Sequence, residues 1–370
     1  MDALANLLDG PRARGAFLLR SILTPPWSLR IEDRAPLCLA LMVSGEGWVV
    51  PDSGEPVRLR PGDIAVIRGP EPYTVADAPT TAPRIVIHPG QISATPEGVE
   101  LCEEMDLGVR TWGDVAPEVV NAAVTLEGGA WDGAGDTRSG TVAGSETGTV
   151  AGSDAGSGDA DGSGDADGSA VMITGTYQMR GEISQRLLSA LPHVLLMPGD
   201  AWTSPLPALL REEIIRDEPG QEVVLDRLLD LLLIAVLRAW FSRPEAGAPA
   251  WYVAQSDPVV GPALRLLHDE PAHPWTVAAL ATRTGVSRAA LGRRFTELVG
   301  EPPMSYLTNW RLSLAADLLR EPDATIGAVA RKVGYGSPFA LSAAFKRVRG
   351  ISPQQHREGA VADAEGVAAS

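Results

Sequence analysis

Two nine-residue stretches, fifty positions apart, repeat one frame. Both "SRAALGRRF" at 287–295 and "SPFALSAAF" at 337–345 carry Ser, then Leu four residues later, then Phe four residues after that. This spacing places the Leu and the Phe on one face of a helix, and a Ser before such a stripe is a favoured N-cap. Each copy therefore predicts a short helix that docks through one apolar face. The residues assigned to its core are Leu291, Phe295, Leu341 and Phe345.

A small-residue segment precedes each copy. "TVAALATRTG" at 276–285 and "TIGAVARKVG" at 325–334 each begin with Thr and end with Gly, as a capped helix does. A helix, a short Gly-containing turn and a second helix form the helix-turn-helix signature. One such match is a weak signal, but two matches joined by the amphipathic stretch at 305–321 are a strong one. We predict an all-α domain of two helix-turn-helix units at 256–358.

The charge of the chain is unevenly distributed. A net charge of −16 over 370 residues argues, taken alone, against a nucleic-acid partner. Within 258–358, however, Lys and Arg outnumber Asp and Glu, so the acidic excess lies in the rest of the chain. A locally basic domain is the electrostatic footprint of a DNA-binding protein.

The first half of the chain has a different pattern. Short β-branched runs between Gly and Pro, as in "PLCLALMVSGEGWVV" and "RIVIH", predict an antiparallel β sandwich or barrel over 29–90. A further strand is expected at 171–179, and helices follow it. The stretch "QEVVLDRLLDLLLIAVLRAWF" is apolar around most of its surface, so the β domain, another helix or a second subunit must cover it. The expected fold class is α+β.

Residues 128–169 are Gly, Ser, Ala, Asp and Thr almost throughout. Such a segment has too few apolar side chains to offset its ordering entropy, so we predict a disordered insertion. Its "DADGSGDADG" lacks the final Glu of a calcium loop and is better explained as an acidic linker. The insertion would interrupt a sensor domain at 1–120 and 170–243, and 359–370 would be a disordered tail.

The cysteines and the apolar runs indicate the compartment. Cys38 and Cys102 are the only cysteines and form no CxxC, which is typical of a reduced intracellular environment. The longest apolar run, 228–241, is interrupted by Asp230 and Arg238 and is too short to span a bilayer. We predict a cytoplasmic protein with no membrane partner.

The C-terminal hundred residues resemble the DNA-binding domain of the AraC/XylS transcriptional regulators. The resemblance covers nearly all of that domain and includes "WRL" and "LL" in the connecting helix. At its end it includes Phe345, Arg347, Gly350, Ser352, Pro353 and Arg357. The N-terminal part, with "PW" at 26–27 and "LRPGD" at 59–63, resembles the cupin-type sensor domain of one branch of these regulators. The resemblance implies a cupin-like antiparallel β-barrel with helices.

The resemblance also implies that two recognition helices enter successive major grooves and read bases at exposed positions. These positions fall on Ala289, Gly292 and Arg293, and on Pro338, Phe339, Ser342 and Ala343. Apart from Arg293 and Arg288, few of them can form bidentate hydrogen bonds with bases. We therefore expect the first helix to carry most base readout and the second to act through phosphates. The remaining members of the predicted DNA-binding set are Arg294, Lys346, Arg347 and Arg349.

The sensor domain departs from the metal-binding cupins. The strand expected to carry two histidines has none, and Tyr73 stands where a later His would be expected. His88 is solitary and is interpreted as a strand-end residue bonded to backbone, so no metal and no cofactor is predicted. A small-molecule effector pocket lined by Cys38, Trp48 and Tyr73 remains open beside plain core packing.

Some relatives of this kind resemble thiol-based oxidant sensors, but their cysteines align here with Ser21 and Thr174. Cys38 lies in an apolar run and is expected to be a buried, inert thiol.

Together these observations predict a sequence-specific transcriptional regulator that is not an enzyme. Double-stranded DNA is its expected partner, an unknown small molecule or stress signal its effector, and RNA polymerase and a second copy are further candidates. A cupin-type enzyme is opposed by the missing metal ligands. A DNA-repair alkyl acceptor is opposed by the lack of a Cys beside a His. A protein-interaction adaptor is the third alternative.

Overall fold

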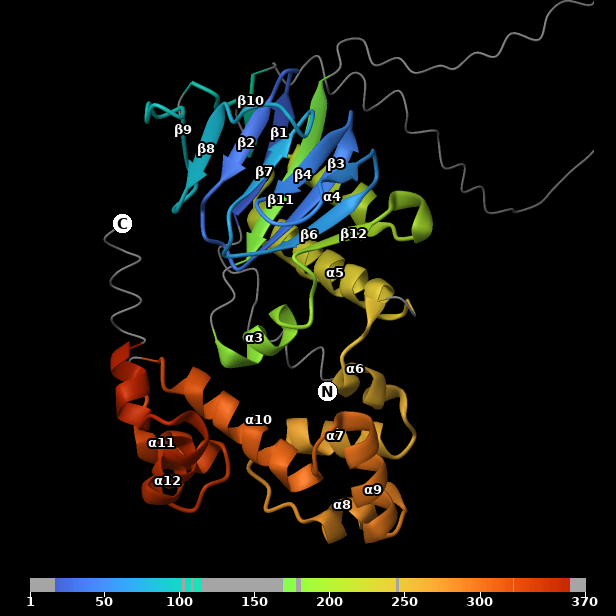
Figure 1. Ribbon diagram of the computed structural model, residues 1–370, viewed down its shortest axis with the longest axis vertical. Coiled ribbons are helices and arrows are strands. Elements are labelled where there is room, and N and C mark those ends of the chain that lie inside the picture. Colours follow the sequence, from blue (N-terminus) through green and yellow to red (C-terminus); the bar gives the residue numbers. More distant parts are fainter. Residues whose placement is uncertain are drawn as a thin grey trace, which may run out of the picture.

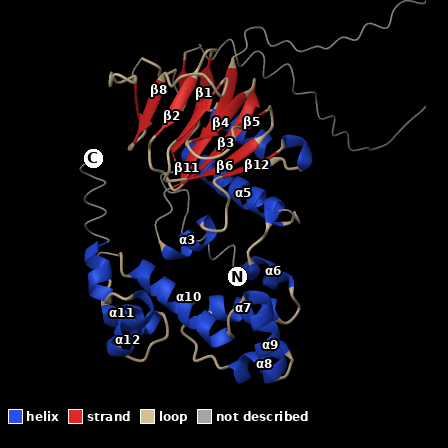
Figure 2. Cartoon of the chain, viewed as in Figure 1, coloured by secondary structure: helices blue, strands red, loops and turns tan. Residues whose placement is uncertain are grey.

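The computed structural model describes residues 17–101, 104–107, 110–114, 169–177, 181–243, 246–321 and 323–359. A β domain with attached helices lies at one end of the molecule and an all-helical domain at the other (Figures 1 and 2). The fold is α+β. The predicted insertion at 128–169 and the tail at 359–370 lie outside the described residues, except for Ser169 and Gly359.

Two six-stranded sheets form the β domain. The first has the order β10-β1-β11-β3-β6-β12 and the second β5-β4-β7-β2-β8-β9. The strands of the first sheet are β1 (Phe17–Leu23), β3 (Leu37–Ser44), β6 (Ile64–Arg68), β10 (Thr111–Gly113), β11 (Ala170–Tyr177) and β12 (Val194–Met197). Those of the second are β2 (Ser28–Ile31), β4 (Gly47–Pro51), β5 (Val57–Leu59), β7 (Tyr73–Ala76), β8 (Ile85–His88) and β9 (Ile92–Ala94).

Of the expected sandwich or antiparallel barrel, the structure favours the sandwich, and the strands are not all antiparallel. Within the described part of the chain the strands form two separate sheets, and β10 beside β1 and β8 beside β2 run parallel. The four edge strands β5, β9, β10 and β12 are only three or four residues long. Buried residues of both sheets pack in one core between them, so the domain is a sandwich.

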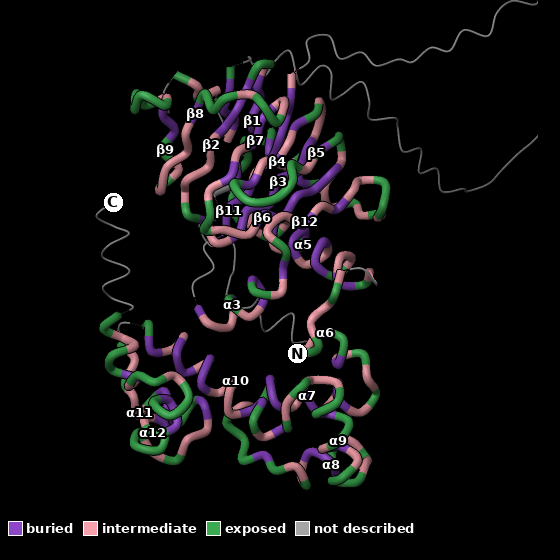
Figure 3. Tube along the Cα trace, viewed as in Figure 1, coloured by how far each residue is buried: buried purple, intermediate pink, exposed green. Residues whose placement is uncertain are grey.

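Helix α5 (Gln221–Phe241) has the bounds of the predicted apolar helix. Of the three covers that the sequence left open, the β domain and another helix both cover it. Leu225, Leu229 and Leu233 share one buried core with β11 and β3 and with the buried residues of α4 (Leu206–Ile214). Figure 3 shows buried segments concentrated in these strands and along α5. Close approach depends on Gly175, where an added Cβ would lie 2.6 Å from a Leu229 methyl. The sensor domain also contains α3 (Glu182–Leu188), the 3-10 turn η1 (Gly199–Ala201) and α4 (Leu206–Ile214).

The C-terminal domain contains the predicted pair of helix-turn-helix units. Its elements are α6 (Ala250–Val253), η3 (Ala254–Ser256), α7 (Val260–Asp269), α8 (Val277–Thr284), α9 (Arg288–Val299), α10 (Pro303–Leu318), α11 (Ile326–Lys332) and α12 (Pro338–Arg349). The hydroxyls of Ser287 and Ser337 accept hydrogen bonds from the N–H groups of Ala290 and Ala340, so the predicted N-caps are confirmed. The four Leu and Phe residues of the repeated frame are fully buried, as predicted. No helix in the described part of the chain has the length and apolar character needed to cross a membrane.

Candidate functional site

The two helix-turn-helix units lie at opposite ends of α10 (Figure 1). Each has its own core: Leu291 and Phe295 of α9 pack in the first, and Leu341 and Phe345 of α12 in the second. Because these side chains fix one face of each helix against its core, the opposite faces of α9 and α12 are left to solvent.

The outward face of α9 carries the reading residues predicted for the first helix. Arg288, Ala289 and Arg293 are exposed and Gly292 is half-buried. Arg294 is also exposed, but it donates to the carboxylate of Asp257 from Nε at 2.8 Å and from a terminal nitrogen at 2.5 Å. These hydrogen bonds lower the pKa of Asp257 to about 2. Arg294 therefore ties α9 to the segment that begins the domain.

The outward face of α12 has different chemistry. Phe339 is 85% exposed, and Ala343, Lys346 and Arg347 follow it at helical spacing, all exposed. Pro338 is exposed at the start of the helix and Ser342 is half-buried. An aromatic side chain left in water on such a face is typical of a contact surface, and a thymine methyl is a matching partner.

Arg349 does not share this face. It forms an ion pair with Glu182 of α3, and its guanidinium donates to the Ser313 hydroxyl at 3.1 Å. Among the described residues, no ion pair holds Arg288, Arg293, Lys346 or Arg347. The structure thus separates the predicted cations into four unpaired ones on the outward faces and two, Arg294 and Arg349, that are paired within the protein.

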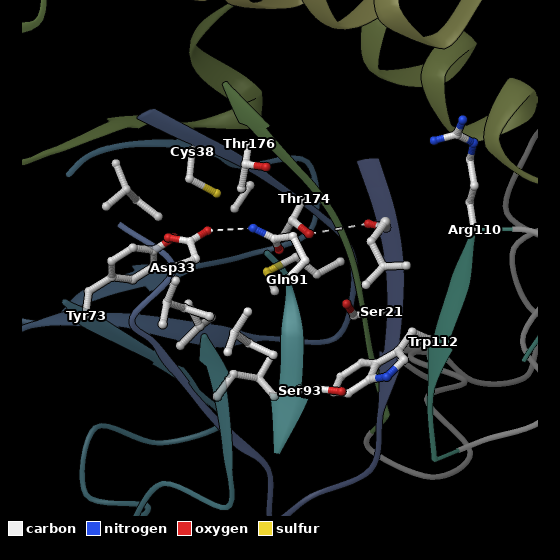
Figure 4. A pocket seen from close by; sticks show the side chains of 18 of the residues that line it. Ser21, Asp33, Cys38, Tyr73, Gln91, Ser93, Arg110, Trp112, Thr174 and Thr176 are labelled. Carbon is white, nitrogen blue, oxygen red and sulfur yellow. Dashed lines mark hydrogen bonds between the residues drawn. The ribbon is translucent and has the colours of Figure 1, made fainter. Parts of the chain in front are cut away.

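A cavity of about 410 Å³ lies between the two sheets (Figure 4). Its wall from the first sheet comes from β1, β3, β6, β10 and β11, and its wall from the second from β2, β7, β8 and β9. Its apolar lining includes Leu19, Leu29, Ile31, Ala40, Ile67, Val75, Ile87, Trp112 and Met172. Cavities of this size hold small organic molecules in other proteins.

Two of the three predicted pocket residues, Cys38 and Tyr73, line this cavity. The assignment of Trp48 to the pocket is wrong, because this side chain is absent from the lining of the cavity. Side chains alternate along a strand, and on β4 the buried positions are Gly47, Val49 and Pro51, which leaves Trp48 on the other face.

Polar residues that the sequence did not single out complete the lining. The Gln91 side chain donates to the Asp33 carboxylate at 2.9 Å, and Arg110 lies at the rim (Figure 4). The non-glycine residues with positive φ among the described ones are Arg34, Gln91 and Arg110, at 58°, 64° and 47°. Two of them line the cavity and the third follows Asp33. Strained backbone of this kind concentrates at functional sites.

Cys38 is poorly suited to redox chemistry. Burial raises the pKa of its thiol to about 12, the hydrogen bond with Tyr73 lowers it less, and the charge of Asp33 raises it further. At neutral pH the sulfur is therefore a thiol rather than the reactive thiolate. Ser21 and Thr174, the positions that align with the cysteines of oxidant-sensing relatives, both line the cavity. Cys102 lies outside the described residues.

His88 is half-buried at the end of β8 and does not line the cavity. Within the described ranges, His, Cys, Asp and Glu side chains nowhere gather in a group of three that could hold a metal ion.

Comparison with known proteins identifies both parts of the chain. A family described as Cupin matches residues 2–137 and 133–242, which is more than half of the chain, and one described as Helix-turn-helix domain matches residues 280–359. The chain belongs to the cupin family. This member has the cupin domain at its N-terminus and the AraC-type helix-turn-helix domain at its C-terminus.

Curated relatives of this AraC-type chain have matching names. A Streptomyces antibioticus protein described as an AraC-like transcription regulator is 40% identical over 192 residues, which are 50% of this chain and 63% of that protein. The HTH-type transcriptional regulator AlkR of Acinetobacter baylyi is 34% identical over 178 residues, 46% of this chain and 58% of its own length. The chain thus matches less than two thirds of these relatives.

Among solved structures, the DNA-binding domain of AdpA in complex with a target DNA is 33% identical. The aligned region covers 29% of this chain and 96% of the AdpA chain, with a TM-score of 0.28.

Proposed function

We propose that this AraC-type chain is a sequence-specific, DNA-binding transcriptional regulator controlled by a small molecule in the sandwich cavity, and that it has no catalytic role. The observation that carries the proposal is the outward faces of α9 and α12. They present four unpaired cations and an exposed Phe339 on a chain whose net charge is strongly negative. A locally basic, aromatic surface on paired recognition helices is suited to the major groove.

The residues have separate roles in this proposal. Arg293, with Arg288 beside it, forms bidentate hydrogen bonds to guanine edges, which is the commonest specific contact of arginine. Lys346 and Arg347 contact phosphates, while Phe339 and Ala343 touch thymine methyls. Arg294 and Arg349, although part of the predicted set, support the surface through their ion pairs. The two helices then enter successive major grooves, about 34 Å apart.

The lining of the cavity indicates its occupant. Aliphatic and aromatic walls surround a few polar groups, among them Asp33, Gln91 and Arg110. We propose a mostly apolar effector with one or two polar groups at the Asp33–Gln91 end. The sensor domain is assigned to 1–120 and 170–243 and the DNA-binding domain to 256–358. We also propose RNA polymerase and a second copy of the chain as partners, and a cytoplasmic location.

Two substitutions test the DNA-binding function on sites selected from a random DNA pool. Arg293→Ala should remove the preference among sequences, because it deletes a base contact. Arg347→Ala should weaken binding to all duplexes about equally and lower the slope of log affinity against log salt by about one, because it deletes a phosphate contact. Salt-titrated binding to selected and random duplexes measures both quantities.

Arg58→Ala, on β5 of the sensor domain, is the control and should change neither quantity. An equal loss of affinity for selected and random DNA in Arg293→Ala would contradict the assignment of base reading to α9. Failure of the native chain to enrich any site would favour the adaptor alternative.

A further inference from the structure

Helix α3 lies between the β domain and α10 (Figure 1) and contacts both domains. On one side, Leu187 and Leu188 are buried in the same core as Ile173 and Tyr177 of β11. On the other side, the first turn of α3 faces the DNA-binding domain, where the carboxylate of Asp317 approaches it. The helix is therefore part of the sensor core and an interface at the same time.

Asp317, on α10, caps α3 from the other domain. Its two carboxylate oxygens accept hydrogen bonds from the N–H groups of Glu182 and Ile183, at 2.6 and 3.2 Å. These amides lie in the first turn, where a helix provides no acceptor of its own. Gly181 makes the approach feasible, because its φ is +138° and an added Cβ would lie 2.8 Å from the Asp317 carboxylate.

Two arginines complete the contact. Arg349 of α12 forms its ion pair with Glu182. The Arg186 guanidinium carbon lies 5.3 Å from the ring centroid of Tyr306 and 6.0 Å from that of Trp310, within the range of a cation–π interaction.

The partners of α3 come from both helix-turn-helix units. Tyr306 packs in the core of the first unit, whereas Arg349 belongs to the second recognition helix. Asp317 lies near the end of α10 that adjoins the second unit. One short helix thus contacts both units at once.

The same helix is connected to the cavity. Met172, Thr174 and Thr176 of β11 line the cavity, and α3 begins five residues after Tyr177, which ends that strand. Tyr177 is fixed by a 2.8 Å hydrogen bond from its hydroxyl to the Leu229 carbonyl. The strand that lines the cavity and the helix that touches the DNA-binding domain are thus close in sequence and share one core.

Docking also has an electrostatic cost. Burial raises the pKa of both Glu182 and Asp317, against the opposing effects of Arg349 and of the two backbone N–H groups. The cost of desolvating the two carboxylates therefore offsets part of the stabilisation that their partners provide.

We propose that α3 is the coupling element of this protein: docked across both helix-turn-helix units, it orients the two recognition helices for one duplex, and the state of the cavity sets its docking. The DNA part of this inference rests on the proposed function. Two linked recognition helices that are oriented before binding have a higher joint affinity for DNA, because less orientational freedom is lost on binding.

Hydrogen exchange of the full-length chain tests docking without any DNA or ligand. The amides of Glu182 and Ile183 should be protected in the native chain. Asp317→Ala should speed their exchange at least tenfold, since it removes their acceptor. Arg349→Ala should speed it about fivefold, and its neighbour Arg347→Ala, which does not contact α3, should leave it unchanged.

A pair of glycine substitutions tests the close approach of Asp317. Because Gly181, at φ 138° and ψ 160°, also has a conformation that strains any side chain, Asp317→Ala is the variant that is free of backbone strain. Gly181→Ala should undock α3, because the new Cβ would clash with Asp317. Gly220→Ala is the matched control: Gly220 also precedes a helix at positive φ, 88°, but nothing lies within 4 Å of its added Cβ. The proposed docking would be overturned if the Glu182 and Ile183 amides exchanged fast in the native chain. Equal exchange rates of these amides in the Gly181→Ala and Gly220→Ala variants would also overturn it.

Coupling is tested by filling the cavity and by measuring DNA binding. Thr174→Phe, or the milder Thr176→Ile if that variant fails to fold, should change exchange at α3 about fivefold, whereas Thr74→Phe on the outer face of β7 should not. Gly181→Ala should weaken binding to a selected duplex about tenfold. The coupling would be overturned if hydrogen exchange at α3 were the same in the cavity-filling variants as in the native chain. It would also be overturned if Gly181→Ala undocked α3 without weakening DNA binding. If the native chain binds no DNA, the proposed function fails while the exchange experiments still decide on docking.

Discussion

At the scale of single residues, His268 shows how a titratable group can be built into a helical core. Its Nε2 lies 2.8 Å from the Tyr306 hydroxyl, and its ring centroid lies 4.4 Å from that of Trp310. Burial lowers the pKa of His268 to about 3, with the charge of Arg186 acting in the same direction and that of Asp269 against it. The imidazole is therefore neutral in the folded protein at physiological pH.

This burial predicts a pH-dependent stability. Between about pH 6.5 and pH 3 the unfolded chain binds a proton at His268 that the folded chain does not, so stability falls as the pH falls. The slope from this group is about 1.4 kcal/mol per pH unit below 6.5. Urea unfolding followed by circular dichroism at pH 7.0 and 5.5 measures it. His268→Gln should reduce the loss between these two values, and an unchanged loss in that variant would assign the effect to other groups.

At the scale of the elements, the repeated frame determines where the recognition helices begin. The Ser287 and Ser337 hydroxyls each accept from an N–H three residues later, at 3.2 Å. A cap of this kind contributes about 1 kcal/mol to stability. Because the two helices share the frame and differ on their outward faces, the caps and the cores are the common part of the two units.

The caps give a matched experiment. Ser287→Ala and Ser337→Ala should each lower the free energy of unfolding by about 1 kcal/mol, since each leaves a helix N–H without its acceptor. Ser305→Ala, at an exposed position inside α10, should be neutral or slightly stabilising, because Ala is the better helix former. The urea midpoints of the three variants, compared with that of the native chain, measure these changes. A loss at Ser305 as large as at the caps would contradict the capping argument.

The helical elements could be predicted from the sequence and much of the cavity could not. The caps, the closing glycines and the bounds of α5 follow from spacing within one short segment. The cavity depends on strand register over long separations: Asp33 meets Gln91 across 58 residues, and β10 joins β1 through parallel pairing. Trp48 was misplaced because a large apolar side chain favours the interior, whereas the alternation along β4 places it outside.

At the scale of the whole molecule, the sheet order explains how the sensor domain can contain a long interruption. Gly113 of β10 pairs with Ile22, and Ala170 of β11 pairs with Leu23, on opposite sides of β1. The chain thus leaves and re-enters the first sheet at the same end of one strand. Two strand spacings, about 10 Å, separate the two points.

A shortened chain should therefore fold. Replacing residues 131–169 by about six Gly and Ser residues keeps enough length to cross the gap, since six residues can span about 20 Å. The melting temperature and the affinity for a selected duplex should stay nearly the same, because no described side chain of the core or of α9 and α12 is removed. A large drop in melting temperature would show that the replaced segment supports the fold.

The unequal outward faces of α9 and α12 also give the DNA-binding domain a direction. Under the proposed function, arginines on one helix and an aromatic and small residues on the other read different bases, so the site bound by one copy of the chain would not be a palindrome. Base preference would concentrate in one half of the site, and the other half would tolerate many sequences. A chain bound to such a site would have one defined orientation on the promoter. Inverting the site would turn its sensor domain toward the DNA on the opposite side of the site.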